Sequence, residues 1–341
     1  MKKIIIILFC LTSLIFGFQV TKDTDFGWHY RCGKELLAGN PCLENHYSYF
    51  LPDYKAYYPS FIYDAALSVS YDSFGFTGLS ILNSIILLLC VILLYKLING
   101  PLWLKATLPL LILFTPGPSI ALGLRPQLFT FLFFLLTLKI GEISLKNYKY
   151  LYLLPLLFAL WVNTHIGFIA GILLLPSLFL NHPLRKKWVI ILPFFIAFLA
   201  TFLNPFGPKV YLEIFRHLQA PLSTTIAEWV APPLWLKGLI VFLVFDLSLL
   251  LASTKQLKLS LLINLLLFTV LACLGIRNLI FLSSLTAIYL SRLLPDKKLL
   301  DDRYAILVIL FCLFIFYKNI NSTINFNSGW KNYCTLGQLP G

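Results

Sequence analysis

The first 29 residues, MKKIIIILFCLTSLIFGFQVTKDTDFGWH, decide the fold of this chain. Two lysines precede the apolar run Ile4–Val20, and the carboxylates Asp23 and Asp25 follow it, with His29 behind them. The run is just long enough to cross a hydrocarbon core of about 30 Å. Its end offers no small-residue pair of the kind at which signal peptides are cleaved. We therefore predict a retained signal-anchor helix with its N-terminus in the cytoplasm.

Apolar runs of this kind recur along the rest of the chain. Hydrophobic residues make up 59% of the 341 residues and charged residues 12%, and the mean hydropathy is +0.84. Soluble domains carry about 25% charged residues, so this chain has too little charge to cover a water-facing surface. The composition predicts an all-α, polytopic membrane protein, and the apolar runs predict about eleven transmembrane helices. The membrane is expected to be the plasma (inner) membrane.

The net charge of +13 does not indicate a nucleic-acid partner. The basic residues form short groups between the apolar runs, such as Arg185–Lys187 and Lys255–Lys258. Cytoplasmic connections of membrane proteins carry such groups, so membrane topology explains the basic composition. Because two basic flanks on one face need an even number of crossings between them, we expect the apolar stretch around 163–165 to form two helices, not one kinked helix.

The predicted topology divides the chain into four parts. These are a signal anchor over residues 1–20, a first extracytoplasmic loop over 21–73, a multi-span domain over 74–317 with a second outer loop at 204–237, and a short extracytoplasmic tail over 318–341. Cys32 and Cys42 share the first loop, and a disulfide between them stays an open expectation for an oxidising compartment. Asp246 lies within a predicted span and is expected to face the protein interior or a cavity.

Ionisable residues gather at the predicted outer ends of the spans. The candidates for a site are Asp23, Asp25, His29, Arg125, His165, Glu228 and Arg277. A charge at the centre of a membrane helix is unfavourable by about 2.5–3.5 kcal/mol, so charged residues near spans generally have a partner or a function. Plain structural roles stay open for each of them, such as ending a span, interfacial snorkelling or local pairing.

This set of residues suits the transfer of a sugar from a lipid phosphate to a hydroxyl. Asp25 or Asp23 would be the general base for the acceptor hydroxyl. The departing phosphate would be held by Arg125, Arg277 and His165, because the arginine fork matches phosphate oxygens.

Two further contacts are expected at this site. Glu228 and His29 are candidates to contact the acceptor or a metal. The Asp23-x-Asp25 pair can also hold a divalent cation such as Mg²⁺ or Mn²⁺ through its oxygen atoms.

The same residues carry a family resemblance. The pattern Asp23-x-Asp25-x-x-Trp28-His29-x-x-x-Gly33, followed by Pro41 and Tyr47-Ser-Tyr49, resembles the first external loop of GT-C superfamily membrane glycosyltransferases. The branch it resembles is related to protein mannosyltransferases and to lipopolysaccharide-core enzymes of the RgtA/B/C/D type. Further stretches similar to that branch are Leu124-Arg-Pro-Gln-Leu128, Trp161-Val-Asn-Thr-His165-Ile-Gly167, Asn204-Pro-Phe-Gly207, Ile226-Ala-Glu-Trp229 and Ile276-Arg277.

The resemblance implies a polyprenyl-phosphate sugar as donor and a first-loop aspartate as base. It also implies transfer on the extracytoplasmic face to a lipid, glycan or protein acceptor. Family members commonly continue into an extracytoplasmic C-terminal region, so the tail over 318–341 is expected to be a short or truncated form. Two other classes remain open, a lipid-linked glycan flippase or transporter and a non-catalytic membrane scaffold.

Overall fold

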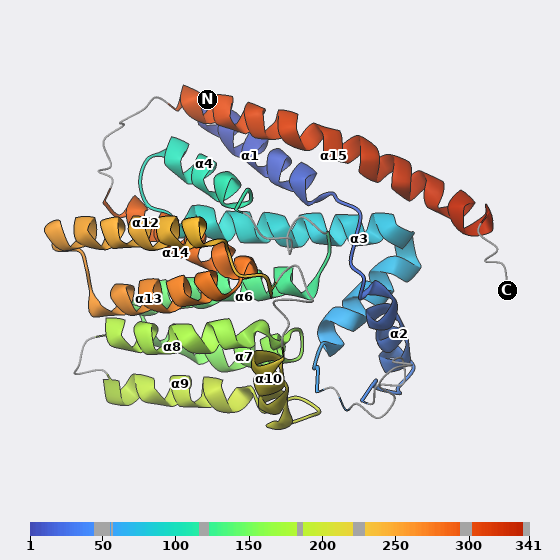
Figure 1. The fold of residues 1–341 in the computed structure, drawn as a ribbon, viewed down its shortest axis with the longest axis horizontal. Helices are drawn as coiled ribbons and strands as arrows, with labels where there is room; N and C mark the ends of the chain where they lie inside the picture. The colour runs from blue at the N-terminus through green and yellow to red at the C-terminus, as the bar shows by residue number, and fades with distance from the viewer. Residues whose placement is uncertain are drawn as a thin grey trace.

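The computed structural model describes residues 1–43, 55, 57–115, 123–182, 187–220, 229–293 and 302–336. All regular secondary structure in these ranges is helical, as predicted, and no strand occurs in them (Figure 1). The α-helices are α1 (Lys2–Gly17), α2 (Phe26–Leu37), α3 (Phe61–Leu97), α4 (Leu102–Ile112), α6 (Pro126–Ser144), α7 (Leu153–Val162), α8 (Ile169–Asn181), α9 (Lys187–Ala200), α10 (Lys209–Gln219), α12 (Leu234–Ser253), α13 (Leu259–Leu274), α14 (Leu279–Ser291) and α15 (Arg303–Leu336). Short 3₁₀ turns are η1 (Tyr148–Tyr152), η2 (Ile166–Phe168) and η5 (Ile276–Asn278).

Three of these helices, α3, α6 and α12, are long and apolar enough to cross a membrane, and several shorter helices are also apolar. In the apolar window of α12, 22% of the residues are buried inside the protein, compared with 56% in the apolar window of α3. Large side chains such as Phe242 and Phe245 are exposed on α12. An apolar surface of this kind is compatible with a membrane protein, because lipid can cover it. The number of about eleven spans stays a prediction.

The expected inward position of Asp246 is wrong. Ile240, Val244, Leu247 and Leu251 form the buried stripe of α12, at helical spacing, and Asp246 lies off that stripe with its side chain exposed. Four buried residues spaced by three and four positions fix the rotation of a helix, and the position before Leu247 then turns away from the bundle.

Helix α3 is bent at Gly75, where φ is +60° and ψ is −149°. Glycine takes this backbone conformation without the strain that a Cβ would add. The part before the bend lies beside α2, and the part after it runs through the bundle (Figure 1). The second predicted span begins at Phe74, one residue before this bend. The start of the apolar run in the sequence therefore coincides with the place where α3 changes direction.

Polar side chains of α3 fix the end of α1. Asn83 Nδ2 donates to the carbonyl oxygen of Gly17 at 2.6 Å, and Ser84 Oγ donates to that of Leu14 at 3.0 Å. The last carbonyls of a helix have no partner within it, so these bonds satisfy groups that would otherwise be unpaired. They also fix where the chain leaves α1 toward Asp23.

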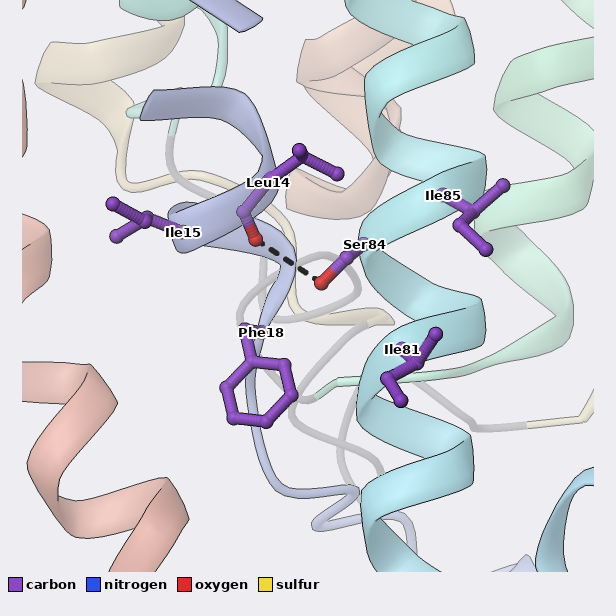
Figure 2. Close-up of a pocket in the computed structure, with 6 residues that line it drawn as sticks. All are labelled: Leu14, Ile15, Phe18, Ile81, Ser84 and Ile85. Atoms are coloured by element: carbon purple, nitrogen blue, oxygen red, sulfur yellow. Dashed lines mark hydrogen bonds between the residues drawn. The ribbon is translucent and has the colours of Figure 1, made fainter. Parts of the chain in front are cut away.

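An apolar groove of about 300 Å³ lies at this α1–α3 contact (Figure 2). It is lined by Leu14, Ile15, Phe18, Ile81, Ser84 and Ile85. The single polar side chain in that lining, Ser84, is already bonded to the carbonyl of Leu14. The groove therefore offers apolar contact alone and carries none of the candidate site residues.

The chain reverses between α7 and α8, which confirms two helices in place of one kinked helix. A Cβ added at Gly171 of α8 would contact the rings of Phe158 and Trp161 on α7, so the two helices pack against each other. Asn163 holds the turn in place, since its Nδ2 donates to the carbonyls of Ala159 and Leu203.

The two ends of the bundle differ in their residues. At one end the backbone N–H of Asn99 donates to Ser291 Oγ, and Lys139 Nζ donates to the carbonyl of Lys96. These residues belong to the basic connections of the sequence. At the other end lie α2, the first part of α3 and α10 (Figure 1), together with Arg125 and His165. The predicted site residues and the basic connections are thus separated along the helix axes.

Helix α15 extends further than expected. The last predicted span ends at Tyr317, yet the helix continues to Leu336. Residues 318–336 contain no proline and one glycine, Gly329, so no strong helix breaker interrupts them. The segment predicted as a tail is therefore helical over most of its length.

Candidate functional site

Asp23 and Arg125 form a buried ion pair. Arg125 Nη2 lies 3.1 Å from Asp23 Oδ1, and the two side chains are 7% and 1% exposed, respectively. The same oxygen accepts a hydrogen bond from the backbone N–H of Asp25 at 3.3 Å. Burial raises the pKa of Asp23, and the charge of Arg125 partly opposes that shift. Asp23 is thus a fixed counter-ion of Arg125.

The local sequence explains why these two residues meet. Pro126 occupies the first turn of α6, and the residue before a proline prefers an extended backbone, as Arg125 has with φ −143° and ψ 155°. Gly123 has φ +82°, and a Cβ there would come within 2.7 Å of the carbonyl oxygen of Val20. The glycine lets the segment before α6 pack against the segment before Asp23.

His165 is held by a chain of hydrogen bonds. Trp161 Nε1 donates to Thr130 Oγ1 at 2.9 Å, and Thr130 Oγ1 lies 2.7 Å from His165 Nδ1. The backbone N–H of Gly167 also donates to Nδ1, at 3.2 Å. With Nδ1 acting as acceptor, the proton of the neutral ring belongs on Nε2, an assignment inferred from these bonds.

The charge state of His165 follows from its surroundings. Desolvation is the main reason that its pKa is lowered, and the positive charges of Arg277 and Arg125 lower it further. His165 is therefore neutral near pH 7 and presents an Nε2–H donor. It also lies within electrostatic range of both arginines, which come from distant parts of the sequence.

Arg277 lies over the ring of Trp229, with its guanidinium carbon 3.3 Å from the ring centroid. The backbone N–H of Ile276 donates to the carbonyl of Val230 at 3.0 Å and fixes the two segments together. A guanidinium stacked on an aromatic face keeps its edge free for in-plane hydrogen bonds. Trp229 thus orients Arg277.

One feature is common to Arg125, His165 and Arg277. Each of them lies at the start of a helix. Arg125 precedes α6, His165 is the N-cap of η2, which leads into α8, and Arg277 lies in η5, which leads into α14. The first N–H groups of a helix and its dipole favour an anion. Two cations, an imidazole N–H and three helix starts are therefore found at the same end of the bundle.

Asp25 differs from Asp23 in being exposed. It is the N-cap of α2, and its side chain makes no capping hydrogen bond. The backbone N–H of His29 bonds to the carbonyl of Asp25 at 3.2 Å, so the two residues lie one helical turn apart. Of the two predicted bases, Asp25 is the one that can reach a hydroxyl from outside.

His29 forms a pair that the sequence did not predict. Its Nδ1 lies 2.5 Å from Oδ1 of Asp64 on α3, and Asp64 Oδ2 accepts from Ser60 Oγ at 2.9 Å. Both side chains of the pair are about 95% buried, with 5% and 4% exposed. Asp64 is one acidic residue among seven in its loop, and spacing alone does not show that it faces His29, 35 residues away.

Gly33 makes this pair possible. It follows His29 by one helical turn, and a Cβ on it would overlap the carbonyl oxygen of Asp64 and Oγ of Ser68. Ser68 Oγ in turn donates to the carbonyl of Tyr30 at 2.8 Å. The His29-x-x-x-Gly33 spacing therefore places both residues on the face of α2 that packs against α3. On this face the imidazole of His29 bonds to Asp64, and Gly33 leaves room for Ser68.

Gly33→Ala is expected to lower the free energy of unfolding by about 1–3 kcal/mol. Alanine favours a helix interior over glycine by about 1 kcal/mol, but here the added methyl collides with backbone and pushes α2 from α3. Gly27→Ala on the same helix is the control, because its Cβ would have no neighbour within 4 Å. Equal unfolding curves for the two variants, measured in detergent, would contradict the close α2–α3 packing.

The structure pairs Cys32 with Cys42 in a disulfide, with their Cα atoms 5.2 Å apart. This bears out the open expectation for the first loop. Cys32 lies on α2, three residues after His29, so the bond ties the segment that follows α2 back onto the helix that carries His29. Disulfides persist in oxidising compartments, which agrees with the predicted outer position of this loop.

Glu213 on α10 is a second buried carboxylate that the sequence did not single out as a site residue. It is fully buried and accepts from the backbone N–H of Tyr57 at 3.3 Å and from Arg216 Nη1 at 3.2 Å. Tyr58 Oη bonds His217 Nε2 on the same helix. These contacts hold two tyrosines at the end of the bundle where Arg277 lies, and Tyr58 is within electrostatic range of it.

Two predicted contacts remain to be described, the one made by Glu228 and the one to a metal ion. Glu228 lies outside the described residues, and so does most of the tyrosine-rich stretch 47–63. For the metal, no group of three or more possible ligands occurs within the described part of the chain. Asp23 Oδ1 is bonded to Arg125, and His29 Nδ1 is bonded to Asp64. The expected Mg²⁺ or Mn²⁺ at Asp23 and Asp25 stays a prediction.

No protein-family model matches this chain, and neither a curated protein nor a solved structure matches it. The assignment of a function therefore depends on the residues and their geometry.

Proposed function

We propose that this protein is an integral-membrane glycosyltransferase of the GT-C type that transfers a sugar from a polyprenyl-phosphate donor to an extracytoplasmic acceptor. The acceptor is a hydroxyl of a lipid, glycan or protein. The observation that supports the proposal most is the grouping of Arg125, His165 and Arg277, each at the start of a helix. Such a group favours a phosphate, and an acidic segment lies beside it.

Each residue has a role in this proposal. Arg277 and Arg125 bind the phosphate oxygens of the donor and stabilise the charge that grows on them as the sugar leaves. His165 donates Nε2–H to the same group without adding a full charge. Asp25 accepts the proton of the acceptor hydroxyl as general base. Asp23 holds Arg125 in place.

Donor consumption tests the proposal directly. The purified protein in lipid nanodiscs is incubated with radiolabelled polyprenyl-phosphate sugars, with and without a membrane extract as acceptor source. An enzyme releases polyprenyl phosphate and labels an acceptor. A flippase moves the donor across a vesicle bilayer and leaves it intact, and a scaffold does neither, so both alternatives would be recognised in this assay.

Arg277→Lys is expected to reduce transfer by about 10- to 100-fold. The substitution keeps the positive charge but removes the planar fork, and a hydrogen bond to a charged group contributes about 1.5–3 kcal/mol. Arg292→Lys is a matched control, because Arg292 lies over Tyr289 at the opposite end of α14, 5.2 Å from the ring centroid. If both variants retain wild-type rates, Arg277 has no part in donor binding.

A further inference from the structure

Helix α10 is amphipathic in the opposite sense to a helix that has one face in water. Its inward face carries Val210 and Glu213, which are fully buried. Its outward face carries Leu212, Phe215 and Leu218, which are 47%, 60% and 70% exposed. At about 3.6 residues per turn, these three side chains fall on the side of the helix away from the buried pair. A helix at a water-facing surface has its polar side chains outward and its apolar ones inward, so water does not explain the outward face of α10.

The position of α10 shows which surroundings this face meets. The helix lies across the ends of α8 and α9 and does not continue their direction (Figure 1). Tyr211 Oη is hydrogen-bonded to Thr201 Oγ1 at 2.6 Å, and its ring packs against Phe198 and Phe202 near the end of α9 and against Phe168 of η2. Helix α10 is therefore fixed at the end of the bundle, where the apolar helices stop.

The exposed apolar surface of the bundle leads up to α10. Phe195 and Leu199 of α9 and Leu203 just after it are all exposed, and they recur at intervals of four residues along one side of the helix. Leu203 precedes the turn that leads into α10. Large exposed apolar patches mark contacts with a membrane or with another protein.

Two cations lie along one edge of α10. Lys209 Nζ lies 5.6 Å and the guanidinium carbon of Arg216 lies 5.3 Å from the centroid of the Tyr57 ring. The two basic residues are two helical turns apart, which places them on one line along the helix, between the buried face and the apolar face. Long basic side chains lay their stems on apolar surface and keep their charge at its polar border. An apolar face bordered by lysine and arginine is typical of a helix in a membrane interface.

We infer, independently of the proposed transfer, that α10 lies in the surface of a lipid bilayer. Its apolar face enters the boundary between the headgroups and the acyl chains, and Lys209 and Arg216 lie at the level of the lipid phosphates. The basic edge favours lipid over a second copy of the chain, because headgroup phosphates supply anions along the whole length of the helix.

The buried side of α10 leads to Arg277. The ring of His217 lies 6.1 Å from that of Trp229, and the guanidinium of Arg277 lies over Trp229. Tyr58 Oη bonds to His217 Nε2 and holds the imidazole in place. Two side chains therefore connect the backbone of α10 to Arg277, which places Arg277 close to the level of the lipid headgroups.

Photocrosslinking identifies what covers the apolar face. The full-length variant Phe215→p-benzoylphenylalanine is placed in vesicles of phosphatidylethanolamine and phosphatidylglycerol, because the illuminated benzophenone bonds to a neighbouring C–H group. We expect an adduct heavier than the protein by one phospholipid, with the new bond near the glycerol end of an acyl chain. The same replacement of Leu218 tests this face if the Phe215 variant does not insert.

Two exposed positions serve as controls. Phe245 lies near the middle of α12, so its replacement should give a bond further along the acyl chain. The Arg31 side chain on α2 is 65% exposed and paired with Glu35, so its replacement should give no lipid adduct.

Other outcomes overturn the inference. A product of doubled mass from position 215 would assign the face to a contact between two copies of the chain. Lipid bonds at the same depth for positions 215 and 245 would place α10 inside the bilayer, away from its surface. The absence of a lipid adduct at both 215 and 218, or an equal yield at Arg31, would show that the apolar face of α10 does not bind lipid.

Discussion

Arg125→Gln is expected to lower the free energy of unfolding by about 3–5 kcal/mol, because it leaves the buried Asp23 without its counter-ion. Removing one partner of a buried pair destabilises far more than removing both. The double variant Asp23→Asn/Arg125→Gln should therefore recover part of the loss. Unfolding in mixed micelles, followed by circular dichroism, measures each change.

The pH dependence of Arg125→Gln provides a second check. Burial already raises the pKa of Asp23, and the loss of Arg125 removes a charge that lowers it. The pKa of Asp23 in the folded variant then lies further above its unfolded value, so the folded state binds more protons. The variant should gain stability as the pH falls toward the range in which carboxylates are protonated.

An exposed pair on α2 serves as the control for this prediction. Arg31 Nε lies 2.8 Å from Glu35 Oε1, with 65% of the Arg31 side chain exposed. Exposed pairs contribute about 0–1 kcal/mol, so Arg31→Gln should have little effect. Similar losses for Arg31→Gln and Arg125→Gln would show that Asp23 and Arg125 are not a buried pair in the folded protein.

Asp25→Asn should reduce transfer by about 10²- to 10⁴-fold while the protein stays folded and inserted. The Asp25 side chain makes no capping hydrogen bond, so its replacement by asparagine removes the base and preserves the start of α2. The measurement is donor consumption at saturating donor, with the far-ultraviolet circular dichroism spectrum to confirm the fold.

Asp72→Asn is the matched control for Asp25→Asn, since it removes a carboxylate from the same pair of helices. It should keep the wild-type rate. Full transfer activity in Asp25→Asn would exclude Asp25 as the base and would leave Asp23 as the candidate.

Much of the helical framework could be predicted from the pattern of apolar runs. The predicted span Leu279–Ser291 coincides with α14, and the predicted start at Phe74 lies one residue before the bend of α3. Apolar runs predict these elements because the helices themselves are apolar over their length. The rotation of a helix about its axis needs the positions of its neighbours, and the expectation for Asp246 was wrong for that reason.

The residues of the candidate site likewise fall into those that the sequence could identify and those that it could not. Arg125, His165 and Arg277 could be selected because polar residues at the ends of apolar runs are conspicuous in sequence. Thr130 and Asp64 could not, because a threonine inside α6 and one of several acidic residues in a loop have no local feature that sets them apart. Their importance comes from what they touch.

The sequence by itself determined that the chain is helical and apolar, where most of its helices lie, and which of their ends carry ionisable groups. These are properties of consecutive residues, set by composition and by the spacing of apolar side chains. The tertiary structure decided which of those groups meet. It joined Asp23 to Arg125 and His29 to Asp64, because packing at Gly123 and Gly33 brings distant backbones close enough for buried charges to pair. Asp25 stayed exposed at the start of α2, since no partner from another helix covers it in the described part of the chain.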